Sequence, residues 1–201
     1  CLVLDPATGR KAAQIDLPAD LAAAWSNLRV WRDFLVGQSG KHLVCMNRHS
    51  GRLAWKYECG RANLSLAVGG GKVFCAELID IKRPGPAGGE DAQARALDIQ
   101  TGKLLWQIPG GSDVRYSRSL DLVVMSSGIY RAKDGSLAAA LPEASKAGAK
   151  TRPENAPRPL FIIGQKVLVG TEESFVVYDL LSGKPTGEAM TWTRRGCTIP
   201  R

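Results

Sequence analysis

Three carboxylates in or beside apolar, strand-like segments are the first candidates for chemistry: Glu77, Asp80 and Asp121. A carboxylate can act as a general base or help to bind a cation such as calcium. Calcium takes six to eight oxygen ligands, so a calcium site would show as a convergent group of acidic residues. The sequence shows no such group, because its Asp and Glu residues fall mostly in turns and insertions. We therefore expect no metal site and no catalytic residue in this chain.

Cysteine and histidine do not supply the spacing of a metal site either. No Cys-x-x-Cys motif occurs, and His42 and His49 flank a strand and a turn, where a solvated side chain is expected. Cys45 and Cys75 lie inside apolar runs and should be small buried hydrophobic residues. Five cysteines are an odd number, which argues against a closed disulfide framework; the other three are Cys1, Cys59 and Cys197.

Charge and glycine patterns also exclude several classes of function. The 201 residues carry a formal net charge of +8, but Lys and Arg are scattered over turns, so we expect a soluble rim and no nucleic-acid interface. Gly69–Gly71 lacks the Lys-Ser/Thr and the helix that follow a phosphate loop, and Arg194–Arg195 is expected to be a solvated turn. No apolar stretch of about 18 residues is present, so no membrane span is expected. The opening residues, CLVLD, are strand-like and show no leader.

A repeated turn organises the chain. Five segments place a glycine between two apolar runs, and these glycines are Gly9, Gly51, Gly102, Gly135 and Gly183. Their mean separation of about 43 residues fits a four-stranded propeller blade, which takes roughly 40–50 residues. A two-sheet β-sandwich would also contain strands and turns, but it would not explain five copies of one turn at this spacing.

The turn has its own chemistry. In the third copy, Asp98 can accept hydrogen bonds from backbone amides, Thr101 follows it, and Gly102 supplies the positive φ that closes the hairpin. The first and fifth copies repeat the pattern at Asp5 and Asp179, and Asn replaces Asp in the second. In the fourth copy, Asp134–Gly135 is expected to form a shorter turn.

Two more strand-like runs precede most of these turns, so each unit should hold about four antiparallel strands. The predicted fold is therefore all-β: a single β-propeller domain over residues 1–201, with about four to five blades present and an incomplete ring. The expected repeats cover residues 1–17, 25–60, 64–110, 113–142 and 159–192, with residues 193–201 as the start of a further blade.

Three segments depart from the repeat. Residues 80–93 and 141–159 are rich in Pro and polar residues, and are expected to be a surface insertion in the middle hairpin of the third repeat and a connector before the last one. Residues 18–28, PADLAAAWSNL, could form one short turn of helix between blades.

The pattern formed by Ala96, Asp98, Thr101, Gly102 and Trp106 resembles the signature repeat of PQQ-like (pyrroloquinoline-quinone-type) β-propellers. A weaker copy ends in Trp55. The resemblance implies that this tryptophan packs between adjacent blades, where a flat ring buries a large apolar area. In the other copies the same position is Ala13, Ala139 and Gly187. The C-terminal TWTRRGCTIPR is similar to bacterial members in which the chain continues into further blades.

The resemblance implies a structural role for the repeat signature. Its residues are Asp5, Gly9, Gly51, Trp55, Asp98, Thr101, Gly102, Trp106, Asp179 and Gly183. Quinoprotein alcohol dehydrogenases of this class combine PQQ, calcium, an Asp base and often two adjacent cysteines; adjacent cysteines are absent here. We therefore expect a non-enzymatic binding or scaffolding module without a cofactor.

Its partner would be another protein or further blades of the same chain. The resemblance also implies a location in the periplasm or another extracytoplasmic space. One alternative is part of a PQQ-dependent oxidoreductase with PQQ and calcium. A WD-repeat scaffold comes last, because the Gly-His and Trp-Asp signatures are missing.

Overall fold

The computed structural model describes residues 1–21, 24–60, 64–77, 92–109, 113–125, 127–141, 160–170, 174–193 and 196–198. The regular elements of these residues are all β-strands, and they pair antiparallel in five sheets. The first sheet is the hairpin of β1 (Leu2–Leu4) and β2 (Lys11–Gln14).

Three sheets have four strands, each paired with its neighbour in chain order. One consists of β3 (Ser26–Trp31), β4 (Phe34–Ser39), β5 (His42–Asn47) and β6 (Leu53–Glu58). The next consists of β7 (Leu64–Gly69), β8 (Lys72–Glu77), β9 (Gln93–Asp98) and β10 (Leu104–Pro109). The third consists of β11 (Arg115–Ser117), β12 (Leu122–Met125), β13 (Gly128–Arg131) and β14 (Leu137–Ala140).

The last sheet has five strands, β15 (Leu160–Ile163), β16 (Lys166–Gly170), β17 (Ser174–Asp179), β18 (Pro185–Thr193) and β19 (Gly196–Thr198). Residues 193–201 were expected to start a further blade. Strand β19, which lies in this segment, pairs with β18 and so extends the preceding sheet.

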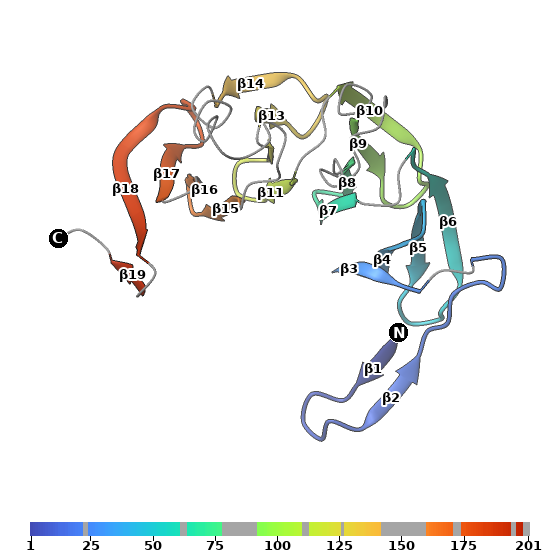
Figure 1. Ribbon diagram of the computed structural model, residues 1–201. Helices are drawn as coiled ribbons and strands as arrows, with labels where there is room; N and C mark the ends of the chain where they lie inside the picture. The colour runs from blue at the N-terminus through green and yellow to red at the C-terminus, as the bar shows by residue number, and fades with distance from the viewer. Residues whose placement is uncertain are drawn as a thin grey trace.

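The sheets follow one another along an open arc (Figure 1). Strands β3, β7, β11 and β15 lie on the concave side of the arc, and β6, β10, β14 and β18 lie on the convex side (Figure 1). Radially arranged meanders of four strands are the blades of a β-propeller, so the predicted fold class is confirmed.

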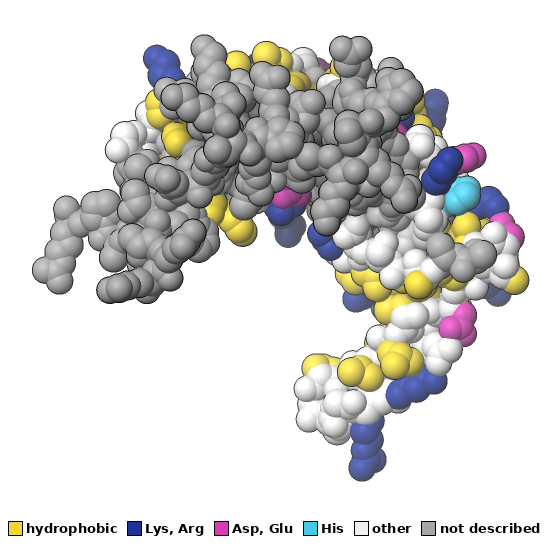
Figure 2. Space-filling model, viewed as in Figure 1, with side chains coloured by type: hydrophobic (Ala, Val, Ile, Leu, Met, Phe, Trp, Pro, Cys, Tyr) yellow, Lys and Arg dark blue, Asp and Glu magenta, His cyan; other side chains and the backbone are white. Residues whose placement is uncertain are grey.

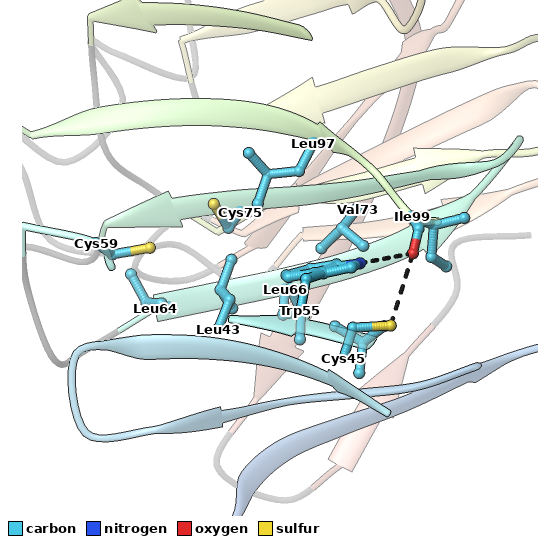
Figure 3. Packing of buried hydrophobic residues seen from close by; sticks show 11 residues of the cluster. Leu43, Cys45, Trp55, Cys59, Leu64, Leu66, Val73, Cys75, Leu97 and Ile99 are labelled. Atoms are coloured by element: carbon cyan, nitrogen blue, oxygen red, sulfur yellow. Dashed lines mark hydrogen bonds between the residues drawn. The ribbon is translucent and has the colours of Figure 1, made fainter. Parts of the chain in front are cut away.

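The core lies between successive sheets. The four inner residues of β5 are apolar and buried, and β8 and β9 are buried along most of their length, because each of these two sheets lies between neighbouring sheets. One cluster joins the β3–β6 sheet to the β7–β10 sheet through residues such as Leu43, Trp55 and Leu66, as Figure 3 shows. Two further clusters join the following sheets in the same way.

The repeated turn has the same backbone hydrogen bonds in all five copies. In the third, Asp98 Oδ1 accepts hydrogen bonds from the amides of Gln100 and Thr101 at 3.0 and 2.8 Å, and from the Thr101 hydroxyl at 2.8 Å. The Gly102 amide donates to the Asp98 carbonyl at 2.8 Å, and Gly102 has a φ of +69°. Asp5, Asn47 and Asp179 accept the equivalent bonds in their own turns.

The expectation of a shorter fourth turn is wrong. The Gly135 amide donates to the Arg131 carbonyl and the Arg131 amide to the Ser136 carbonyl, both at 2.9 Å, which is the same backbone pattern. Arg131 thus stands in the Asp position, and Asp134 Oδ1 instead accepts from the Ser136 amide at 2.9 Å. The turn keeps its length because the backbone bonds and the positive φ of Gly135 define it.

The expected helical turn at residues 18–28 is also wrong for the residues that the structure describes. Pro18–Leu21 form a single turn, in which the Leu21 amide donates to the Pro18 carbonyl at 2.9 Å, and Ser26 already begins β3. The insertion expected at residues 80–93 ends earlier, because Gln93 begins β9; residues 80–91 lie outside the described part. The same holds for residues 142–159 of the expected connector.

Candidate functional site

The structure places Glu77 in a buried ion pair. Its side chain, at 2% exposure, lies 2.6 Å from the guanidinium of Arg95, which also donates to Gln107 Oε1 at 2.9 Å. Glu77 Oε1 additionally accepts the Gly60 amide at 3.0 Å, and Oε2 accepts the Gln93 amide at 3.2 Å. A carboxylate held this way connects strands and loop backbone, and its acceptor positions are taken by protein groups.

Asp121 lies elsewhere, in the exposed turn between β11 and β12, with a φ of +51°. It accepts a hydrogen bond from the Tyr116 hydroxyl at 2.8 Å. Asp80 falls outside the described residues.

The described residues therefore do not bring the three acidic candidates together, and none of their His, Cys, Asp and Glu side chains gather in groups of three or more that could hold a metal. They do not offer the donor set that a calcium-bound quinone would need.

A hollow of about 800 Å³ instead lies at the ends of three successive sheets. The β3–β4 turn contributes Arg32, the β7–β8 turn contributes Gly70 and Gly71, and the β11–β12 turn contributes Arg118. In an antiparallel sheet of four strands, the turn between the third and fourth strands lies at the same end as the turn between the first and second. Gln100 from the β9–β10 turn therefore also lines the hollow. The remaining lining residues are Val30, Trp31, Lys72, Tyr116 and Asp121. We call this hollow the turn-face pocket.

Tyr116 lines the turn-face pocket and packs closely against Gly69 and Gly70. The Tyr116 ring stacks on Phe74 with centroids 5.0 Å apart. A Cβ atom added to Gly70 would lie 2.6 Å from the Tyr116 hydroxyl, and one added to Gly69 would collide with the same ring. The two glycines thus serve ring packing as well as the hairpin turn that the sequence indicates.

The turn-face pocket is electropositive. Among the described residues that line it, the charged ones are Arg32, Lys72 and Arg118 against the single carboxylate of Asp121. Burial, followed by the hydrogen bond to Asp121, raises the pKa of Tyr116 to about 12, so the phenol stays neutral at physiological pH. An anionic group would therefore meet an excess of positive charge there.

Aromatic surface accompanies this charge. The Arg32 guanidinium lies 4.6 Å from the centroid of the Trp31 ring, a distance at which a cation interacts favourably with the π face. Val30 beside it is 56% exposed. The turn-face pocket can thus contact both a carboxylate and an apolar side chain of one ligand.

Sequence reasoning singled out only two features of this pocket, Asp121 and the Gly69–Gly71 run. Arg32 was hidden because WRDFLVG reads as one strand, whereas Arg32 and Asp33 form the turn between β3 and β4. Lys72 belongs to one repeat and Tyr116 and Arg118 to the next, and no sequence motif connects them. Their proximity follows from the side-by-side arrangement of the sheets.

Charge is dispersed over the described part of the face that Figure 2 shows. Figure 2 shows Lys and Arg at separated points of this face, and hydrophobic side chains over the β1–β2 hairpin. Leu2 and Leu4 of that hairpin are 60% and 55% exposed. The described residues contain no helix with the length and hydropathy that a membrane crossing requires.

The radial four-stranded sheets and the repeated Asp-x-x-Thr-Gly turns define a β-propeller protein of the PQQ-like class. The model of the family described as outer membrane protein assembly factor BamB matches residues 2–196, and the chain belongs to this family. No curated protein matches the chain.

Solved structures share the fold at low sequence identity. BamB from Moraxella catarrhalis is 11% identical, with a TM-score of 0.56, over 82% of this chain and 56% of that one. Hsv2 from Kluyveromyces lactis is 14% identical, with a TM-score of 0.58, over 89% of this chain and 55% of that one. The quinohemoprotein alcohol dehydrogenase ADHIIG from Pseudomonas putida HK5 is 14% identical, with a TM-score of 0.54, over 86% of this chain and 36% of that one. The chain thus spans less than two thirds of each of these structures.

Proposed function

We propose that this chain is a non-enzymatic binding module whose turn-face pocket takes an acidic segment of a partner protein. The observation that carries the proposal is the convergence of Arg32, Lys72 and Arg118 around the rings of Trp31 and Tyr116. Carboxylates of a peptide would pair with the three cations, and an apolar side chain beside them would pack on Trp31. Aromatic residues and Arg are the residue types that contribute most to protein interfaces.

Membership of the BamB family supports the scaffolding part of the proposal, since BamB is an outer membrane protein assembly factor. It also supports a bacterial, extracytoplasmic setting for this chain. The repeat signature residues, from Asp5 to Gly183, serve the fold in this account and not the ligand.

The test is a binding titration followed by fluorescence anisotropy. The probe is a short fluorescein-labelled peptide of Asp, Glu and Phe, and the comparison peptide replaces Asp and Glu by Lys. We expect the acidic peptide to bind, the basic peptide not to bind, and added salt to weaken binding because the contacts are exposed ion pairs.

Arg118→Glu should weaken binding of the acidic peptide by about tenfold or more. The matched control is Arg10→Glu, which makes the same charge change in the exposed β1–β2 turn, away from the turn-face pocket. Equal weakening by both variants would mean that only net charge matters, and would refute a site at this pocket.

The second candidate is a part of a quinoprotein oxidoreductase, which the shared fold of the alcohol dehydrogenase keeps open. The discriminating experiment adds PQQ with calcium to the protein and follows thermal unfolding and dye-linked alcohol oxidation. We expect neither a rise in melting temperature nor turnover. A rise together with turnover would replace the binding-module proposal.

A further inference from the structure

Two cysteines from neighbouring sheets meet inside the core. Cys59 directly follows β6, where its amide donates to the Lys41 carbonyl at 2.8 Å, and Cys75 lies in β8, paired in register with Leu66 and Arg95. Both belong to the apolar cluster between the two sheets, with exposures of 2% and 1%. Figure 3 shows their sulfur atoms pointing toward one another across this cluster.

The surroundings of the pair differ from those of a passive buried thiol. The neighbouring Cys75 thiol lowers the pKa of Cys59 against the opposing effect of burial. The positive charge of Arg95 acts in the same direction. The pKa of Cys75 is raised, first by the neighbouring Cys59 and second by burial.

Cys45, in the same cluster, provides the contrast. Its Sγ contacts the Ile99 carbonyl at 3.6 Å, and burial alone raises its pKa to about 12. It therefore lacks both a thiol partner and an activating charge among its described contacts.

We propose that Cys59 and Cys75 form a redox-controlled disulfide that joins the β3–β6 sheet to the β7–β10 sheet. The Cys59 thiolate attacks one sulfur of an external disulfide of the glutathione type, and one external thiolate leaves. Cys75 then loses its proton and attacks Sγ of Cys59, which expels the second external thiolate. The two protein thiols lose two electrons and two protons in total, and the external disulfide is reduced to two thiols.

Such a bond would fix the contact between two blades at one point of their shared core. It would restrict the unfolded chain by closing a loop between positions 59 and 75, so the oxidised form should be the more stable one. Because both sulfurs are buried, a bulky oxidant reaches them only during folding or when the contact between the sheets opens.

The experiment maps disulfides in the whole chain. Protein is unfolded, refolded with oxidised and reduced glutathione, alkylated, and digested with trypsin, which places all five cysteines in separate peptides. We expect the peptides 57–61 and 73–82 to appear as one linked species, two hydrogens lighter than their sum. We also expect the melting temperature to exceed that of the reduced protein by about 5–10 °C.

Single variants separate the proposed pair from a general effect of cysteine loss. Cys59→Ala and Cys75→Ala should abolish both the linked species and the oxidant-dependent shift in melting temperature, whereas Cys45→Ala, an equally buried control, should retain both. Oxidation of protein that was never unfolded gives a second mapping that does not depend on refolding. Separate alkylation of both cysteines under every oxidising condition, a link through another cysteine, or a linked form without added stability would overturn the proposal.

Discussion

The indole Nε1 of Trp55 donates a hydrogen bond to the Ile99 carbonyl at 2.8 Å, which ties β6 of one sheet to the repeated turn of the next (Figure 3). The same ring covers Gly102, where an added Cβ atom would lie 2.7 Å from the indole. Trp106 repeats the arrangement one sheet further on, with a 3.0 Å bond to the Ala132 carbonyl. The tryptophan and the turn of the repeat therefore act as two halves of a contact between successive sheets.

Trp106→Ala should lower the free energy of unfolding by about 3–5 kcal/mol, because it empties a site where the side chain is 8% exposed. Trp106→Phe keeps a ring but leaves the Ala132 carbonyl without its donor, so it should cost less, about 1–3 kcal/mol. Urea unfolding measures both. An unchanged unfolding midpoint for Trp106→Ala would contradict the packing role.

Gly102→Ala and Gly51→Ala form a matched pair of turn variants. Both glycines have nearly the same φ, +69° and +67°, so each substitution should cost about 1–2 kcal/mol for left-handed backbone. Gly51 has open space around its Cβ position, whereas Gly102 faces Trp55. Gly102→Ala should therefore cost a further 1–3 kcal/mol or so in thermal or urea unfolding. An equal loss of stability in the two variants would show that the Trp55 ring moves aside without an energetic cost.

The turn carboxylates should contribute an acid-sensitive part of the stability. Hydrogen bonds from the amide and hydroxyl of Ser182 lower the pKa of Asp179 below its ordinary value of 3.8. The native carboxylate thus binds a proton more weakly than the unfolded one, so its stabilising contribution is complete above the ordinary pKa and is lost as the pH falls through the lowered value.

Asp179→Ala should reduce the urea midpoint at pH 7, and the difference from the wild type should narrow at pH 3. Asp179→Asn is the control, because Asn47 already accepts the same bonds in the second turn, from the amides of His49 and Ser50 at 3.0 and 2.9 Å. If the urea midpoint of Asp179→Ala differs from that of the wild type by the same amount at pH 7 and pH 3, the ionised Asp179 carboxylate is not the cause of the difference.

Glu77→Ala should destabilise the protein by about 3–5 kcal/mol, because it leaves the Arg95 guanidinium buried without its counter-ion. Glu77→Gln retains an acceptor for Arg95 and Gly60 and should cost less. Neither variant should change binding of the acidic peptide, since Glu77 does not line the turn-face pocket. A loss of peptide binding in a folded Glu77→Gln protein would argue for a ligand site at the ion pair.

Local chemistry is what made the fold predictable. The Asp-x-x-Thr-Gly turn is formed by five consecutive residues, as in Asp98–Gly102, so a local motif reveals it. The distance between successive copies of the turn gives the approximate length of a blade. The fourth turn was misjudged because Arg131 replaces Asp, although the backbone bonds need only the glycine at the fifth position. The short helix was misjudged because its alanines favour helix, whereas Ser26 and the residues after it pair with β4.

The candidate site was largely beyond reach of the sequence. Arg32 and Arg118 are 86 positions apart and each reads as an ordinary turn residue. Only the packing of neighbouring sheets brings their turns to one hollow. The same holds for Cys59 and Cys75: the apolar run around Cys75 indicates burial, but Cys59 is flanked by Glu58 and Gly60, and nothing in the sequence indicates that the two thiols face each other.

Carbodiimide cross-linking of the acidic peptide tests the central claim most directly, since the reagent joins a carboxylate to an amine that it contacts. Among the described residues that line the turn-face pocket, Lys72 is the only amine. The account predicts that peptide mapping finds the principal adduct on Lys72 Nζ. Adducts distributed over remote lysines such as Lys11, Lys56 and Lys184, with none on Lys72, would contradict it.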